Sequence, residues 1–476
     1  EAEAMFDVLT YEKGGSVLRM LEQYLGPEVL RKGIAAYLAE HRYGNTETTD
    51  LWDAIEATSG EPVRSIMDSW IFQGGYPLVS VALSGDRRSI ELRQRRFLYG
   101  GGENEGEEQR WSVPVNLRAS AGGRVRHERT LLSGRNAVVD FDEPVDWVVV
   151  NEGGWGFYRV AYSDELSGRL VAVMDQLDAL ERIGLVGDLW ARVVAGSADL
   201  RQWVEVVTAM GDVDDPDVWL AVLGSLDLLD VISSDADRPA LAGFVRRVAG
   251  PILERMGWDP QPGEDPRRGT FRSRLIAAMG ILGADEAVRE EASRRFARYL
   301  EDRSSLHPDV VTAVVHVAAA AGDEETYEVM RQQLHQAVTP QDQLRYLHAL
   351  GQTPDRQLLG RTLAACLTNE VRSQDAPMLV GRILGSRHGR YEAWEWIEGH
   401  WDDVCARFPN NILIRMMEGA TSLVDERWSE RALAWLDAHA VPGAGVRQDQ
   451  LVERIGINTA LAARVGSHLA AALDGR

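Results

Sequence analysis

Residues 62–83 read PVRSIMDSWIFQGGYPLVSVAL, and the hydrophobic period of the chain changes within this stretch. Before Gly74-Gly75, apolar residues recur at intervals of three and four, as on one face of an α-helix: Val63, Ile66, Met67, Trp70 and Ile71. From Tyr76 the period becomes two, which is typical of a β-strand. The stretch therefore predicts a helix that ends at the glycines and a sheet that begins directly after them.

On the N-terminal side of this change, residues 1–74 have the pattern of helices. A second apolar stripe precedes the stop signal Gly26-Pro27 and consists of Val17, Met20, Leu21, Tyr24 and Leu25. The chain starts at Glu1 without an initiator Met, which indicates a processed protein, a fragment or a cloned segment.

On the C-terminal side, residues 75–163 consist of short strand-like runs. Trp111, Val113, Val115 and Leu117 alternate with other residues as one face of a strand does, and similar runs lie at 77–83, 88–98, 129–132, 137–141, 146–150 and 156–162. Turn signals separate several of these runs. We therefore expect a small β-sandwich domain.

Residues 164–476 return to helical stripes that Gly, Pro or Asp interrupt, without a strict repeat length. Examples lie at 166–182, 200–210, 240–256, 286–300, 308–321, 341–350 and 447–474. Many helices without strands favour an α-helical solenoid of the HEAT or armadillo kind. The predicted fold is thus multidomain, with boundaries at 1–74, 75–163 and 164–476.

The composition restricts the class of protein. The net charge is −22, which makes nucleic-acid binding an unfavourable interpretation because phosphate contacts need clustered Lys and Arg. The short basic runs at 93–96 and 124–126 are predicted to be solvated strand faces. No apolar run approaches the roughly 18 residues of a membrane span. Two cysteines, Cys366 and Cys405, cannot form a dense disulfide framework, so we expect a reduced, cytoplasmic compartment.

Motifs of a self-contained active site are absent from the sequence. No H-E-x-x-H occurs, since His127-Glu128 is followed by Arg129-Thr130-Leu131. There is also no Cys-x-x-Cys, phosphate-binding loop, dinucleotide-binding glycine motif or G-x-S-x-G elbow. The sequence therefore assigns no metal ligand and no cofactor-binding residue to this chain.

The most informative segment is residues 5–21, MFDVLTYEKGGSVLRML. From the residues alone it is a short approach followed by a helix that begins at Gly15 or Ser16, and Tyr11 is a packing residue with a solvated hydroxyl. The segment resembles the stretch that follows the zinc motif in the gluzincin zinc aminopeptidases, which include aminopeptidase N and the puromycin-sensitive aminopeptidases. The resemblance implies that Tyr11 is catalytic and that its hydroxyl stabilises the oxyanion of the tetrahedral intermediate.

Further segments resemble the same family in order and spacing across nearly the whole chain: 43–52, 70–79, 111–115, 150–160, 182–188, 393–401 and 451–458. The resemblance implies that residues 1–74 are the helical C-terminal remnant of a thermolysin-like catalytic domain. It also implies that the helical domain covers the active site of an enzyme that removes N-terminal residues from peptides.

The zinc ligands and the catalytic glutamate of that family have no counterpart in this sequence. We therefore predict that the full-length parent is a zinc metalloaminopeptidase, that this chain alone is inactive, and that its partners are peptide substrates and a missing N-terminal catalytic region. Two alternatives stay open, a non-catalytic helical scaffold and one half of a split aminopeptidase. Five tryptophans at helical spacing are expected to pack between helices and not to bind a ligand: Trp52, Trp70, Trp394, Trp396 and Trp401.

Overall fold

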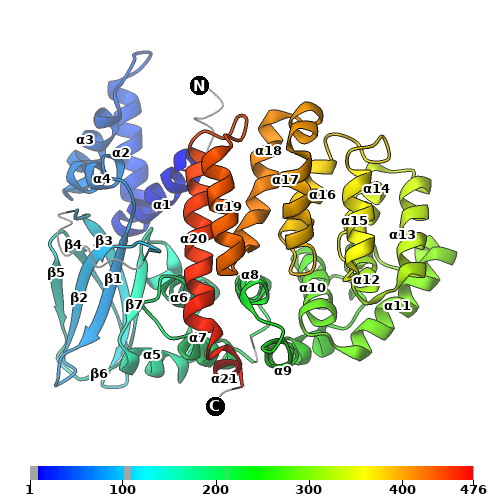
Figure 1. The fold of residues 1–476 in the computed structure, drawn as a ribbon. Coiled ribbons are helices and arrows are strands. Elements are labelled where there is room, and N and C mark those ends of the chain that lie inside the picture. Colours follow the sequence, from blue (N-terminus) through cyan, green and yellow to red (C-terminus); the bar gives the residue numbers. More distant parts are fainter. Residues whose placement is uncertain (1–8, 101–108, 212, 475–476) are drawn as a thin grey trace. The chain divides into compact units, whose positions relative to one another are not determined.

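The computed structural model describes residues 9–100, 109–211 and 213–474 (Figure 1). The chain divides into two compact units, residues 1–192 and 193–476. Each unit is described by itself below. The structure is mostly helical and contains two small sheets, as predicted. The division into three domains at 74 and 163 is finer than these units and stays a prediction.

The first unit begins with helices. A π-helical turn (Leu9–Lys13) leads into α1 (Gly14–Leu25), which is followed by α2 (Pro27–Glu40), α3 (Thr48–Ser59) and α4 (Val63–Ile71). Gly26 separates α1 from α2 at φ 90°, a conformation that glycine adopts without strain. The predicted stripes are confirmed, because the five residues of the α1 stripe and four of the five in the α4 stripe are buried.

Two sheets follow α4. The first has the strand order β5-β2-β1-β7 and the second has the order β4-β3-β6. All strand pairs are antiparallel except β1 with β7, which is parallel. The strands are β1 (Pro77–Leu83), β2 (Ser89–Arg96), β3 (Val113–Ala121), β4 (Arg124–Leu132), β5 (Asn136–Asp140), β6 (Val145–Val150) and β7 (Arg159–Tyr162).

One hydrophobic cluster joins the helices and sheets of the first unit. It contains Leu21 of α1, Trp70 of α4, Val79 of β1 and Val115 of β3, each at most 1% exposed. Because residues of both sheets belong to this cluster, each sheet buries one set of side chains against the other elements of the unit. The helical segment 9–71 is therefore fixed to the sheets by burial of apolar surface.

The first unit ends with α5 (Asp164–Val171) and with α6 (Ala179–Val194), whose last two residues fall in the second unit. The single helix predicted over 166–182 is wrong. Asp178 accepts a hydrogen bond from the backbone N–H of Glu181 at 2.8 Å, and Glu181 accepts one from the N–H of Asp178 at 3.0 Å. This reciprocal capping box starts a new helix inside the predicted one.

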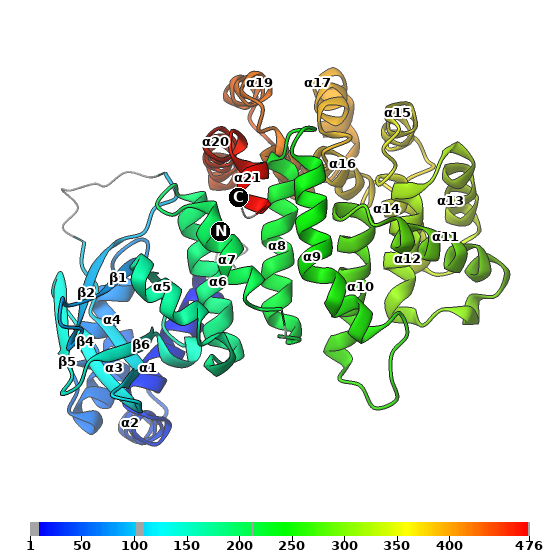
Figure 2. The ribbon, with the colours of Figure 1, turned by 90° about the horizontal axis from the view of Figure 1, so that it is seen from below.

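The second unit consists of helices that contact their neighbours in a regular order (Figure 2). Helix α10 contacts α12, and the series continues through α14, α16 and α18 to α20. The helices are α7 (Leu200–Thr208), α8 (Pro216–Ile232), α9 (Arg238–Met256), α10 (Pro266–Ala277), α11 (Glu286–Glu301), α12 (Pro308–Ala321), α13 (Glu324–Gln336), α14 (Pro340–Leu350), α15 (Arg356–Ala365), α16 (Ala376–Leu384), α17 (Arg390–Arg407), α18 (Asn410–Met417), α19 (Glu426–Ala438), α20 (Val446–Gly466) and α21 (Leu469–Leu473).

The predicted helix 447–474 is interrupted between α20 and α21, at Ser467 and His468. No helix among the described residues has both the length and the apolar character that crossing a membrane requires. Both cysteines are free, Cys366 in the interior and Cys405 partly exposed.

Candidate functional site

Tyr11 lies in the π-helical turn that precedes α1. Its side chain is 58% exposed, so the ring is not a core residue. The turn continues into α1 without a break, and the helix starts at Gly14, one residue before the predicted start. Residues 5–8 of the segment that suggested the family lie outside the described residues. The catalytic role of Tyr11 stays a prediction.

Lys13 connects the Tyr11 turn to the end of α4. Its Nζ donates to the carbonyl oxygen of Gln73 at 3.5 Å, and burial lowers the pKa of Lys13. The Gln73 side chain in turn donates to the carbonyl oxygens of Ser69 at 2.9 Å and of Arg110 at 2.7 Å. Glu12 forms no ion pair with Lys13 within the described part of the chain. The turn that carries Tyr11 is thus held by contacts distant in sequence.

Residues 110–112 form a junction between α4 and the two sheets. The Trp70 indole N–H donates to the Ser112 carbonyl at 3.1 Å, and the Ser112 N–H donates to Ser69 Oγ at 3.0 Å. From the other side, the Gln94 side chain accepts from the Trp111 N–H at 2.9 Å and donates to the Trp111 carbonyl at 2.8 Å. The same Gln94 amide also donates to the carbonyls of Leu132 at 3.1 Å and Gly134 at 2.8 Å.

This junction contains the residues that the sequence analysis missed. Gln94 lies in a run that was predicted to be a solvated face, yet it is 2% exposed. The prediction is correct for Arg93, which is exposed, and wrong for Gln94, because the side chains of a strand alternate between its two faces. The sequence did contain a signal for this burial, because Gln94 is a polar residue at a position of the predicted strand that faces the interior.

The described residues offer no zinc site. No three His, Cys, Asp or Glu side chains among them are grouped closely enough to hold a metal ion. His127, the histidine of the incomplete motif, lies on β4 with 63% of its side chain exposed, and its Nδ1 is 2.6 Å from Glu152 Oε1. A protein zinc site normally uses at least three ligands, so no catalytic step at a metal is assigned to these residues.

Three of the family-like segments converge in the first unit. Arg159 Nη1 lies 3.1 Å from Asp188 Oδ1, and the Val160 N–H donates to Asp188 Oδ2 at 2.8 Å. The Tyr76 hydroxyl accepts from Arg159 Nε at 3.3 Å. Burial raises the pKa of Asp188 to about 6, and Arg159 opposes this shift. The contacts join segments 70–79, 150–160 and 182–188, and they serve to position α6 on β7.

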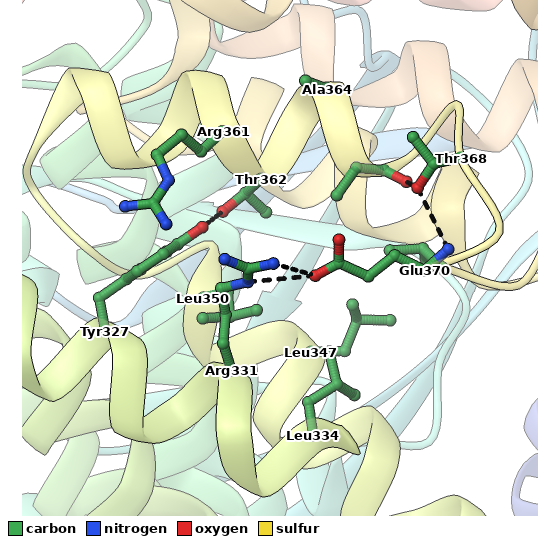
Figure 3. A pocket seen from close by; sticks show the side chains of 12 residues that line it. Tyr327, Arg331, Leu334, Leu347, Leu350, Arg361, Thr362, Ala364, Thr368 and Glu370 are labelled. Carbon is green, nitrogen blue, oxygen red and sulfur yellow. Dashed lines mark hydrogen bonds and ion pairs between the residues drawn. The ribbon is translucent and has the colours of Figure 1, made fainter.

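A pocket of about 310 Å³ lies in the second unit between α13, α14 and α15 (Figure 3). Its floor is apolar and includes Leu334, Leu347 and Leu350. Arg331 donates to Glu370 through Nε at 3.1 Å and Nη2 at 2.8 Å.

The other polar groups of this pocket are also satisfied within the protein. The hydroxyls of Tyr327 and Thr362 are 2.8 Å apart, and Arg361 pairs with Glu328. The charged side chains that line the pocket are therefore already paired within the protein.

Three of the five tryptophans that were predicted to pack in the core or between helices are buried, and Trp396 contacts a residue of its own helix α17. Trp52, Trp70 and Trp394 are at most 5% exposed. Trp396 and Trp401 are half-buried, and their rings contact His400 at 5.2 Å and Trp435 at 4.9 Å between centroids. Trp70 and Trp394 also contact aromatic rings, those of Trp111 and Trp435, whereas Trp52 belongs to the hydrophobic cluster of the first unit.

Two family models match different parts of the chain. The model of the ERAP1-like C-terminal domain matches residues 147–456, and the model of the peptidase family M1 domain matches residues 1–70. Aminopeptidase M1 of Arabidopsis thaliana is 31% identical over 485 residues, which cover 96% of this chain and 54% of the relative. Aminopeptidase M1-A of Oryza sativa subsp. japonica is 32% identical over 480 residues, covering 96% and 53%.

A more distant relative also aligns with most of this chain and with less than half of its own length. Puromycin-sensitive aminopeptidase of Caenorhabditis elegans is 29% identical over 411 residues, which cover 84% of this chain and 43% of the relative. The chain spans about half the length of the curated relatives it matches. Two family models match consecutive parts of the chain, and the first-listed relatives align with 96% of it, so the chain belongs to the M1 aminopeptidase family and corresponds to the C-terminal portion of its members.

Proposed function

We propose that this chain is the C-terminal portion of a zinc metalloaminopeptidase that removes N-terminal residues from peptides, and that it is inactive alone. In this proposal Tyr11 donates a hydrogen bond from its phenol to the oxyanion that forms when the peptide carbonyl is attacked. Zinc and the general base would be supplied by residues outside those described. The exposure of Tyr11 on a turn anchored through Lys13 is the observation that carries the proposal.

An upstream catalytic region is the partner that this proposal requires, and the surface of the first unit supports it. The helix α2 buries only Gly33, although Ile34 and Leu38 form an apolar i, i+4 pair on it and are 39% and 60% exposed. A helix of a globular protein normally buries such a stripe. Further large apolar side chains are exposed in the same segment: Tyr11, Leu18, Tyr43, Ile71 and Phe72.

We therefore propose that the part of an M1 protein that precedes the matched half packs against α1, α2 and α4. The helices at the start of this chain, α1 to α4, leave part of their apolar surface uncovered. Ile34 and Leu38 are 39% and 60% exposed, so covering the rest of their surface would contribute about 1 kcal/mol each. Hydrogen exchange of residues 27–40 is expected to be slower in the longer protein, which includes the upstream catalytic region, than in this chain alone.

The finer features of the fold also remain proposals. We propose that the two sheets form a β-sandwich and that the second unit is a HEAT or armadillo-like array that covers the active site. The contact order α10, α12, α14, α16, α18 and α20 supports a stacked array, because each helix contacts the next member of the series. The free thiols of Cys366 and Cys405 support the proposal of a cytoplasmic protein.

Two measurements test the proposed activity. The purified chain with added zinc is assayed with an aminoacyl p-nitroanilide, and we expect no zinc-dependent hydrolysis. The longer protein is then assayed with Tyr11→Phe, which is expected to lower kcat by about 10²–10³-fold, as the loss of one oxyanion donor does.

Tyr43→Phe is the matched control, because Tyr43 is a fully exposed tyrosine in the same helical segment. Robust hydrolysis by the chain alone, or equal activity of the two variants, contradicts the proposal. If the native protein has no upstream zinc motif, a separately encoded zinc-binding partner favours a split enzyme, and its absence favours a scaffold.

A further inference from the structure

The pocket between α13, α14 and α15 combines an apolar floor with one pair of opposite charges (Figure 3). The floor residues Leu334, Leu347 and Leu350 are at most 9% exposed. Arg331 of α13 and Glu370, which follows α15 in the chain, line the same pocket. Its volume of about 310 Å³ is at the lower end of the range of ligand pockets, so a ligand must be small.

The Arg331–Glu370 pair leaves hydrogen-bonding capacity unused on both partners. Arg331 Nε and Nη2 both donate to one oxygen, Glu370 Oε1, at 3.1 Å and 2.8 Å. Within the residues that the structure describes, Glu370 Oε2 accepts no hydrogen bond and Arg331 Nη1 donates none, although Nη1 lies 3.7 Å from Glu328 Oε2. The two side chains are 30% and 24% exposed, so solvent and small solutes reach them. The pocket thus presents an available donor beside an available acceptor.

The segment that carries Glu370 is fixed by hydrogen bonds of its own. Thr368 Oγ1 accepts from the Glu370 N–H at 3.1 Å and donates to the Ala365 carbonyl at 2.9 Å. Arg407 donates to the Thr368 carbonyl and, at 3.4 Å, to the Val371 carbonyl. The carboxylate is therefore held in place before a ligand arrives, which lowers the entropic cost of binding.

Three parts of the pocket select three different chemical groups. Glu370 Oε2 accepts from a cation, and the end of α15 at Ala365 adds the partial negative charge of a helix C-terminus. Arg331 Nη1 donates to an anion, which for a guanidinium is most favourably a carboxylate or a phosphate. The leucine floor favours an aliphatic group. A cation and an anion next to each other, with an aliphatic group attached, are the parts of a free amino acid.

We propose that this pocket binds a free α-amino acid with an aliphatic side chain. The ligand's ammonium donates to Glu370 Oε2, its carboxylate accepts from Arg331 Nη1, and its side chain covers the leucine floor. An α-amino acid carries both charges on one carbon, which matches the adjacent positions of Arg331 and Glu370. A peptide has them at least one residue apart and fits less well. The ligand is of the same class as the product of the proposed peptidase, but binding here does not depend on that activity.

Isothermal titration calorimetry of the full chain at pH 7 tests the site, because both groups of a free amino acid are charged at this pH. The ligands are L-leucine, 4-methylpentanoate without the ammonium, 3-methylbutylamine without the carboxylate, and glycine without the side chain. We expect saturable binding of L-leucine with a stoichiometry of one. Each of the other three is expected to bind at least about tenfold more weakly, because each lacks one of the three contacts.

Two variants probe different parts of the pocket. Glu370→Gln removes the charge that holds the ammonium. Ala365→Leu fills the cavity from the half-buried end of α15 with a residue that also favours helices. Each is expected to weaken the binding of L-leucine at least about tenfold. Arg356→Gln is the control, since Arg356 is on the same helix, is 71% exposed and pairs with Glu392 outside the pocket.

Helical circular dichroism of each variant shows whether it folds, and the comparison of the four ligands needs no variant. Absence of saturable binding of L-leucine up to about 10 mM overturns the proposal. Equal affinity for 4-methylpentanoate or 3-methylbutylamine overturns the assignment to an amino acid. So does binding of L-leucine that both folded pocket variants leave unchanged, or that Arg356→Gln weakens equally. A failure of the peptidase proposal would leave these results as they are, because no assay of hydrolysis enters them.

Discussion

Gln94→Leu is expected to destabilise the first unit strongly. The Gln94 amide makes four hydrogen bonds to the backbone of Trp111, Leu132 and Gly134, at 2.8–3.1 Å. Leucine has a similar volume but replaces none of these bonds, and the Trp111 N–H would be left without a partner in the interior. At about 1 kcal/mol for each bond, the expected loss is about 4 kcal/mol.

Urea unfolding followed by pulsed hydrogen exchange measures this loss for each unit separately. For a urea m value of about 2–3 kcal/mol/M, a loss of about 4 kcal/mol lowers the midpoint of β3 by about 1.3–2 M. Residues 308–321 of α12 belong to the other compact unit and serve as an internal reference. Their midpoint is expected to remain the same.

Arg93→Leu is the control on the same strand, because Arg93 is exposed and adjacent to Gln94. Its effect is expected to stay within about 0.5 kcal/mol. Gln94→Leu should also speed exchange in α1, since the junction at 110–112 connects through Gln73 to Lys13. Equal midpoints of β3 in the two variants would refute the reasoning that the buried amide joins the sheets.

Three further predictions concern other contacts. His348→Gln should reduce acid lability: burial holds the pKa of His348 at about 4 in the folded chain against about 6.5 unfolded, so its stabilising effect is present above pH 6.5 and is lost as the pH falls toward 4. Urea midpoints at pH 7 and 4.5 should show about 2–3 kcal/mol less loss in the variant. Gly33→Ala should cost about 1–3 kcal/mol by thermal unfolding, because a Cβ would lie 2.9 Å from Ile55 Cα, whereas Gly168→Ala, with open space at its Cβ, should be neutral or stabilising. Arg272→Met should cost about 3–5 kcal/mol and speed exchange in residues 257–265, because the fully buried Arg272 holds Glu264 at 2.7 Å; unchanged exchange there would contradict this role.

Local pattern was enough to predict most elements of the fold. The stripe Val63, Ile66, Met67 and Trp70 became the buried face of α4, and the predicted run 77–83 is β1. These elements follow from the periodicity of apolar residues, which is a property of neighbouring positions. The helix over 166–182 was wrong because one capping box, Asp178 with Glu181, outweighed a continuous apolar stripe.

The family could also be predicted from the sequence, since ordered motifs such as those at 5–21 and 182–188 are visible in the linear chain. The contacts between segments that are distant in the chain could not be predicted from the sequence. Gln94 contacts Trp111 and Gly134, and Lys13 reaches Gln73, across separations that carry no periodic signal.

The sequence by itself determined the order of helices and strands, the family, and Tyr11 as the residue to test. Only the tertiary structure decided that Tyr11 is exposed on an anchored turn, and that the buried Gln94 amide joins the backbone of Trp111, Leu132 and Gly134. Secondary structure depends on residues a few positions apart, whereas a site depends on which helices pack together. That packing is selected by burial of apolar surface over the whole unit.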